Sequence, residues 1–261
     1  MFYHNINPII VRIGPFQIRY YGVIFVLGFV IAYFLIYHLA RKKGLRITKD
    51  DVIDSLFYIL IGVIIGARLF HVVIYDFSYY VKNPLNIFAI WRGGLSFHGG
   101  LVGAVVAGVI FCKRKKMPFY KLADIFVIPL ALGLSLGRIG NFINGELVGR
   151  VTNLPWCVKF KNYSGCRHPS QLYESFKNLV IFIVLWSIKD KKLKDGTLFW
   201  SFILMYSSFR FFIEFFRAPD EQIGFILGLT MGQWLCLIMF FIGICFIINI
   251  NKINKKKNPK N

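Results

Sequence analysis

Apolar residues dominate this 261-residue chain in long runs that are separated by short polar connections. Several runs reach about 20 residues with few charges, which is the length that a helix rising about 1.5 Å per residue needs to cross a hydrocarbon core of about 30 Å. The pattern predicts an all-α polytopic membrane protein. Seven membrane-spanning helices are expected, over residues 19–40, 52–75, 94–112, 122–145, 170–188, 197–216 and 231–250.

The basic residues give these helices an orientation. Lys and Arg cluster after the first, third, fifth and seventh predicted spans, whereas the alternate connections hold only scattered cations. Connections rich in Lys and Arg stay in the cytoplasm. The N-terminus is therefore expected outside and the C-terminus inside. The chain is expected to form a single integral membrane domain (1–261), with outer segments 76–93 and 147–169 and a basic cytoplasmic tail 251–261.

Composition agrees with a membrane location and argues against nucleic acid as a partner. The residues are 56% hydrophobic, with 28 Phe, and the formal net charge is +20. A basic soluble protein of this charge would suggest nucleic-acid binding, but here the cations lie between apolar runs. Cys157 and Cys166 share the predicted outer segment 147–169. A disulfide is permitted there, although two cysteines can also share a loop by chance.

Charged side chains inside the predicted spans are costly, at about 2.5 kcal/mol or more each, so each needs a reason. Once the helices are oriented, these residues converge on the outer half of the membrane. They comprise Arg68 and His71 in the second span, His98 at the start of the third, Arg138, Asn141, Asn144 and Glu146 late in the fourth, and Arg210, Glu214 and Arg217 in the sixth.

Helical spacing groups some of these residues further. Arg138, Asn141 and Gly145 are expected on one face, with Glu146 nearby, and Tyr206, Arg210, Glu214 and Arg217 follow a second stripe. The plainer interpretation of the second stripe is pairing of Arg210 and Arg217 with Glu214. His98 lies between glycines, which permit close backbone approach and leave room for a ligand, whereas Arg68 and His71 are interpreted as structural.

No ligand spacing for a metal appears in the sequence, and no phosphate-binding loop or nucleophile elbow is present. No cofactor is therefore expected. A polar site near one leaflet suits chemistry on lipid head groups, whereas a transporter would be expected to place its site near the midplane, between repeated halves. Two alternatives remain open: an anionic-lipid transporter or flippase that performs no chemistry, and a non-catalytic membrane scaffold.

Five segments carry distinctive motifs, namely GGLSFHGGL at 93–101, GRIGNFINGE at 137–146, YYG at 20–22, RHPSQLYE at 167–174 and FRFFIEFFR at 209–217. These motifs resemble those of the bacterial prolipoprotein diacylglyceryl transferase family. The resemblance covers essentially the whole chain. It implies transfer of the diacylglyceryl group of phosphatidylglycerol to the lipobox cysteine of a preprolipoprotein signal peptide, in the bacterial cytoplasmic (inner) membrane with the active site toward the outer leaflet.

The resemblance also implies the site residues. The family's functional positions map onto Tyr21, His98, Arg138, Asn141, Gly145, Glu146, Tyr206, Arg210, Glu214 and Arg217. Chemistry then suggests catalytic roles for three of them and substrate binding for the rest. His98 is the candidate base for the thiol, and Arg138 and Arg210 are suited to stabilise the departing phosphate ester, Arg138 also binding the lipid.

Overall fold

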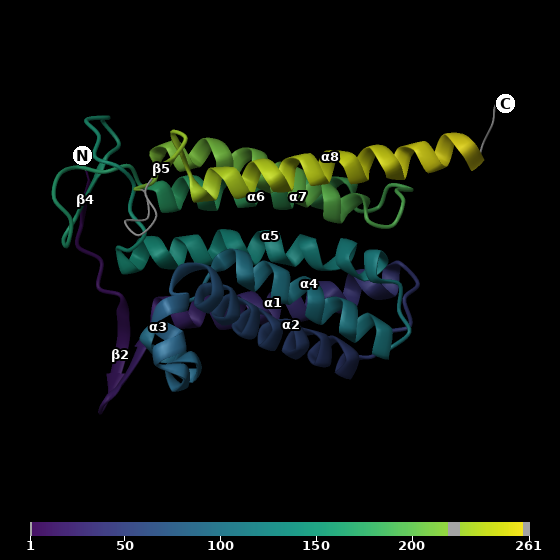
Figure 1. Cartoon of the computed structure of the whole chain (residues 1–261), viewed down its shortest axis with the longest axis horizontal. Coiled ribbons are helices and arrows are strands. Elements are labelled where there is room, and N and C mark those ends of the chain that lie inside the picture. The colour runs from purple at the N-terminus through teal and green to yellow at the C-terminus, as the bar shows by residue number, and fades with distance from the viewer. Residues whose placement is uncertain (1, 219–224, 258–261) are drawn as a thin grey trace. The chain divides into compact units, whose positions relative to one another are not determined.

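A computed structural model describes residues 2–218 and 225–257 of the chain (Figure 1). The chain divides into two compact units. The first unit comprises Met1–Ala32 and Asp124–Asn261, and the second comprises Tyr33–Ala123.

Helices cover all seven ranges in which the sequence predicts membrane spans. They are α1 (Tyr20–Lys42), α2 (Lys49–Phe70), α4 (Phe97–Arg114), α5 (Phe119–Asn144), α6 (Ser170–Ile188), α7 (Thr197–Ile213) and α8 (Met231–Lys257). Among the residues that the structure describes, five stretches are long and apolar enough to cross a membrane, namely Tyr20–Lys42, Lys49–Tyr75, Phe119–Asn144, Thr197–Phe216 and Met231–Ile250. The protein is thus a polytopic, mostly helical membrane protein. In the first, second and last of these stretches, only 17% of the residues in the most apolar part are buried within the protein. Such exposure is expected for helices that face lipid.

Glycines set the packing of α2 against α4 in the second unit. Gly62 and Gly66 on α2 face Gly99 and Gly103 on α4, and a Cβ built on Gly103 would lie 2.0 Å from the Gly62 carbonyl oxygen. Small residues four apart allow the backbones of two membrane helices to approach closely. Helix α2 begins with a capping box in which Thr48 and Asp51 exchange hydrogen bonds.

The segment that follows α2 is held by Arg68. A π-helical turn, His71–Tyr75, leads into α3 (Phe77–Lys82) and the short helices Pro84–Phe88 and Ile90–Arg92. The Arg68 guanidinium donates to the backbone carbonyls of this segment, at distances from 2.6 to 3.2 Å. The carbonyls belong to Asn86, Ile87, Ala89, Gly93 and Gly94. The structural interpretation of Arg68 is confirmed.

In the first unit, hydrogen bonds fix the alignment of the helices that carry the polar residues. The Ser135 hydroxyl on α5 donates to the Ser175 carbonyl on α6 at 2.9 Å, and the Ser175 hydroxyl donates back to the Ser135 carbonyl at 3.0 Å. Helix α7 packs against both α6 and α8 (Figure 1). The Asp124 carboxylate accepts hydrogen bonds from the backbone N–H groups of Gly196 and Phe199 and so caps the start of α7.

Short strands complete the first unit, and the sequence did not predict them. Strand β1 (Phe2–His4) pairs in parallel with β4 (Val158–Phe160), β2 (Ile9–Ile13) forms a hairpin with β3 (Phe16–Arg19), and β5 (Phe225–Ile226) pairs with β6 (Leu229–Thr230). Cys157 and Cys166 form a disulfide, which settles the pairing that the sequence left open.

Candidate active site

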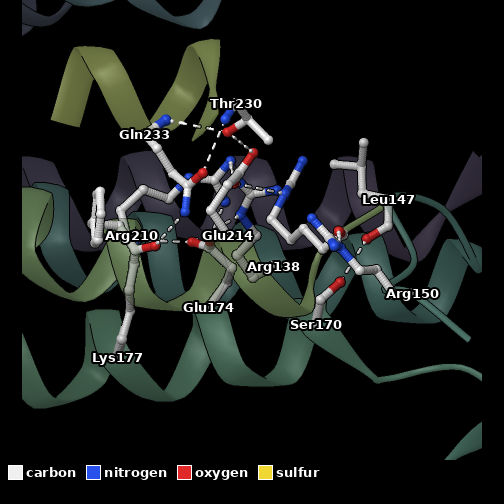
Figure 2. A network of polar contacts seen from close by, with 12 residues as sticks. Arg138, Leu147, Arg150, Ser170, Glu174, Lys177, Arg210, Glu214, Thr230 and Gln233 are labelled. Atoms are coloured by element: carbon white, nitrogen blue, oxygen red, sulfur yellow. Dashed lines mark hydrogen bonds and ion pairs between the residues drawn. The ribbon is translucent and has the colours of Figure 1, made fainter. Parts of the chain in front are cut away.

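A buried carboxylate on α6, Glu174, lies at the centre of the polar residues of the first unit (Figure 2). Its side chain is fully buried. One oxygen, Oε1, accepts a hydrogen bond from Arg210. The other, Oε2, lies 3.0 Å from Lys177 Nζ and 3.9 Å from Arg138 Nε. A carboxylate buried to this degree is tolerated only beside cations that compensate for its lost hydration.

The charge pairing predicted along the second stripe is confirmed. Arg210 Nη2 lies 2.7 Å from Glu214 Oε2, and Arg217 Nε lies 3.5 Å from the same oxygen. The stripe is not one continuous α-helix, however. Helix α7 ends at Ile213, and Glu214–Phe216 form a 3₁₀ turn. The backbone of Arg217 is extended and bridges to Gly149, so this arginine faces Glu214 from beyond the helix end.

The stretch from Arg138 to Glu146 closes on itself through polar contacts. Arg138 Nη1 donates to Asn141 Oδ1 at 3.4 Å, and Asn141 Nδ2 donates to Glu146 Oε1 at 2.7 Å. The placement of Gly145 on the helical face with Arg138 is wrong, because α5 ends at Asn144. Gly145 has a φ of +68° instead. This left-handed turn, which glycine adopts without strain, brings Glu146 back to Asn141.

Two tyrosines predicted for the site lie against these groups in the first unit. Tyr206 on α7 is buried, and Lys177 Nζ lies 3.9 Å from the centroid of its ring. Tyr21, in the first turn of α1, packs over Gly140 of α5, where an added Cβ would lie 2.8 Å from the Tyr21 ring. Gly140 falls between Arg138 and Asn141 in the chain. The structure therefore places Tyr21 beside the chain segment that carries Arg138 and Asn141.

Further polar contacts hold the backbone around these residues, at Glu146, Leu147 and Arg217. Gln171 donates from Nε2 to the Glu146 carbonyl at 2.6 Å, and Ser170 donates from its hydroxyl to the Leu147 carbonyl at 3.0 Å. Arg150 Nε donates to the Arg217 carbonyl at 2.8 Å. Side chains thus fix the backbone at these three positions, and Figure 2 shows one of the contacts, between Ser170 and Leu147.

His98 belongs to the second unit, where it is half-buried in the first turn of α4. Ser96 caps this helix by accepting a hydrogen bond from the Gly99 N–H. The expectation that the flanking glycines leave room for a ligand is wrong for Gly99. A Cβ there would lie 2.3 Å from the Phe70 Cβ, so its missing side chain serves helix packing. In the same unit, His71 Nε2 lies 3.6 Å from Asp76 Oδ2, and the His71 ring stacks on Tyr75.

Sequence reasoning missed Glu174 and Lys177 as site residues. Both are charged and lie three residues apart in the predicted span 170–188. That is the same signal that singled out Arg138 and Arg210. Glu174 was noted only as the end of a motif, and Lys177 was not noted at all. Both residues could have been identified by asking why charged side chains lie within this predicted span as well.

Six side chains define what we call the ion cluster, linked by five ion contacts: Arg138, Glu174, Lys177, Arg210, Glu214 and Arg217. Four cations against two carboxylates leave a formal charge of +2. Arg138 has the loosest contacts, at 3.4 and 3.9 Å, and its side chain is 19% exposed. An arginine with donors to spare, in a cluster with excess positive charge, is equipped to bind a phosphate.

Comparison with known proteins agrees with this chemistry. The profile of the prolipoprotein diacylglyceryl transferases matches residues 8–249. A phosphatidylglycerol–prolipoprotein diacylglyceryl transferase of Geobacter sulfurreducens is 45% identical over 255 residues, which are 97% of this chain and 98% of that protein. Enzymes of the same name from Desulfotalea psychrophila and Coxiella burnetii are 46% and 45% identical, over 92% and 93% of this chain and 91% and 95% of their own. The chain therefore belongs to the prolipoprotein diacylglyceryl transferase family.

Proposed function

We propose that this protein transfers the diacylglyceryl group of phosphatidylglycerol to the lipobox cysteine thiol of a preprolipoprotein. A sulfur–carbon bond forms, and the bond between the glycerol carbon and the phosphate oxygen breaks. The products are a thioether and glycerol phosphate. Near-full-length identity of 45% to enzymes of this name carries the proposal, and the excess positive charge around Arg138 supports it.

Negative charge grows on the departing phosphate ester as the carbon–oxygen bond breaks. Arg138 would bind this ester through its two terminal nitrogens, and Asn141, which touches both Arg138 and Glu146, would fix the head group. Arg210 donates a hydrogen bond to Glu174 and also forms an ion pair with Glu214. Its contribution would be a fixed positive charge beside the ester. Glu214 and Glu146 would orient the cations, and Tyr21 and Tyr206 would line the lipid site.

The thiol must lose a proton to attack carbon efficiently, because the thiolate is the nucleophile. His98 is proposed as the base that takes this proton, which would end on the phosphate ester as glycerol phosphate leaves. Arginine-assisted thiolate formation without a histidine base is the alternative. His98→Gln separates the two, because it retains a polar side chain without a base. Loss of turnover at neutral pH that rising pH partly restores, as the thiol ionises without a base, would support the histidine.

The proposed arrangement in the membrane is seven spans with the N-terminus outside and the C-terminus in the cytoplasm. The whole chain would act as one integral unit of the bacterial cytoplasmic membrane, surrounded by membrane lipids, with its site toward the outer leaflet. Three observations support this: the alternation of basic clusters, the five strongly apolar spans, and a disulfide in the predicted outer segment. Disulfides persist outside the cytoplasm, where thiols are not kept reduced.

The test uses purified protein in liposomes of phosphatidylglycerol with a lipobox peptide that carries one cysteine. Mass spectrometry is expected to show the peptide gaining one diacylglyceryl group, and Arg138→Ala should abolish the gain. The lipid-transport alternative predicts movement of phosphatidylglycerol between leaflets without thioether product. No product from folded wild-type protein, with lipid translocation intact, would replace the transferase proposal with that alternative.

A further inference from the structure

Lys177 is a buried cation that the proposed mechanism leaves without a role. It lies on α6 one turn after Glu174, and its side chain is only 4% exposed. Burying a lysine so deeply is costly unless its charge is used. Within the described residues, Lys177 Nζ finds no hydrogen-bond partner of good geometry, although it lies 3.0 Å from Glu174 Oε2. Lys177 therefore acts on Glu174 chiefly as a point charge.

Two cations compete for the same oxygen of Glu174. Arg210 occupies Oε1, so Oε2 remains for Lys177 at 3.0 Å and Arg138 at 3.9 Å. A charge-assisted hydrogen bond between guanidinium and carboxylate is about 2.8 Å long. Arg138 would need to move only about 1 Å to make one. Lys177 neutralises the negative charge on Oε2, so this oxygen attracts Arg138 less strongly.

We propose that Lys177 is a positioning residue that neutralises Glu174 and thereby keeps Arg138 available for the phosphate of the lipid substrate. The inference rests on the proposed transferase function. Without Lys177, Glu174 would draw Arg138 into a tight ion pair, and the formal charge of the ion cluster would fall from +2 to +1. The ring of Tyr206, 3.9 Å from Lys177 Nζ, holds the ammonium in place through its negative face.

Lys177→Met tests this, because Met is unbranched, similar in length and uncharged. The KM for phosphatidylglycerol is expected to rise about tenfold, since one compensating charge is lost in a low-dielectric site. The inhibition constant of glycerol phosphate, which would bind the same arginine as a product, should rise in parallel. The value of kcat should change less, because Arg138 still reaches the phosphate once the lipid is bound at saturation.

The decisive comparison is the double variant Lys177→Met with Glu174→Gln. Glutamine still accepts a hydrogen bond from Arg210 but carries no charge that could capture Arg138. Both constants should return to within about threefold of wild type, if Lys177 works only by compensating Glu174. Lys177→Arg, which keeps the charge, should stay closer to wild type than Lys177→Met does. Thermal unfolding of every variant checks folding, and Lys177→Gln replaces the Met variant if the latter unfolds.

The outcomes separate the two proposals. Wild-type protein without thioether product overturns the transferase function itself. If wild type transfers lipid but Lys177→Met leaves the KM and the glycerol phosphate inhibition unchanged, the role of Lys177 is overturned and the function stands. If both constants rise equally in the single and the double variant, Lys177 acts through packing, and the positioning role is overturned. Restoration in the double variant supports it.

Discussion

Arg68 in the second unit and Arg138 in the first are both arginines within apolar helices, yet their surroundings differ. Arg68 is 4% exposed and donates to five backbone carbonyls at 2.6 to 3.2 Å. Arg138 is more exposed, and its contacts with Asn141 and Glu174 are long. A charge within a span therefore does not by itself mark a site. What distinguishes a ligand-binding arginine is whether its donors are already satisfied.

The largest effect is expected for a substitution of Arg138, and it is an effect on activity, which distinguishes Arg138 from Arg68. Arg138→Lys keeps the charge but loses the planar fork that holds a phosphate through two nitrogens. We expect kcat/KM to fall by about a hundredfold or more, as when one transition-state donor is removed. Transfer to a lipobox peptide measures it, with thermal unfolding as the check on folding. Near-normal turnover by this variant would remove Arg138 from the centre of the mechanism.

Arg68→Met should show the opposite pattern. Five buried carbonyls would lose their donor, so stability should fall by about 2–4 kcal/mol. The folded fraction should keep most of its activity. Arg114→Met is the matched control, since Arg114 is exposed and donates only to the Tyr58 hydroxyl among the contacts seen. Unfolding by heat or denaturant measures the stability of both variants and of the wild-type protein. Unchanged stability in Arg68→Met would contradict the structural role.

A smaller effect is expected from the disulfide that closes a loop within residues 147–169. Replacing Cys157 and Cys166 together with Ser should destabilise the protein by about 2–3 kcal/mol at most, because the closed loop is short. The spacing is nine residues. Cys245→Ser, at an exposed free cysteine, is the control. A reductant should lower the melting temperature of wild type and leave that of the double Ser variant unchanged. Equal sensitivity in both would argue against the disulfide.

The smallest effect concerns His168, which packs on Phe216 and Tyr173 just before α6. Burial lowers the pKa of His168 below its usual value. The unfolded chain therefore takes up a proton at a higher pH than the folded chain does. The stability from neutral His168 should be complete above about pH 6.5 and decline as the pH falls below that value. His168→Phe should lose this part of the acid sensitivity, and identical pH profiles would contradict it.

The helices were predictable because the hydropathy of a span is a local property of the chain. Polar contacts were predictable where the two residues are close in the sequence, as for Arg210 with Glu214. The pairing of β1 with β4 joins segments about 150 residues apart and leaves no local signal. The turn at Gly145 and the 3₁₀ turn at Glu214 broke the helical spacing that had been extrapolated through them.

Glu174 was not identified from the sequence as a site residue, and the reason is a different one. Its charge was visible in the sequence, but its importance depends on three cations that come from α5, α6 and α7. Helical periodicity describes one face of one helix, and it does not say which faces of different helices meet. The register that joins them, through Ser135 and Ser175, uses residues with no distinctive pattern. Only the packed structure shows that Arg138 and Arg210 share one carboxylate.

A structure of the protein bound to a phosphonate analogue of phosphatidylglycerol would test the central claim most directly. The account predicts phosphonate oxygens about 2.8 Å from the terminal nitrogens of Arg138, with Arg68 still on its backbone carbonyls. It also predicts that Lys177 remains against Glu174. A head group bound away from Arg138, with Arg138 instead closed onto Glu174, would contradict it.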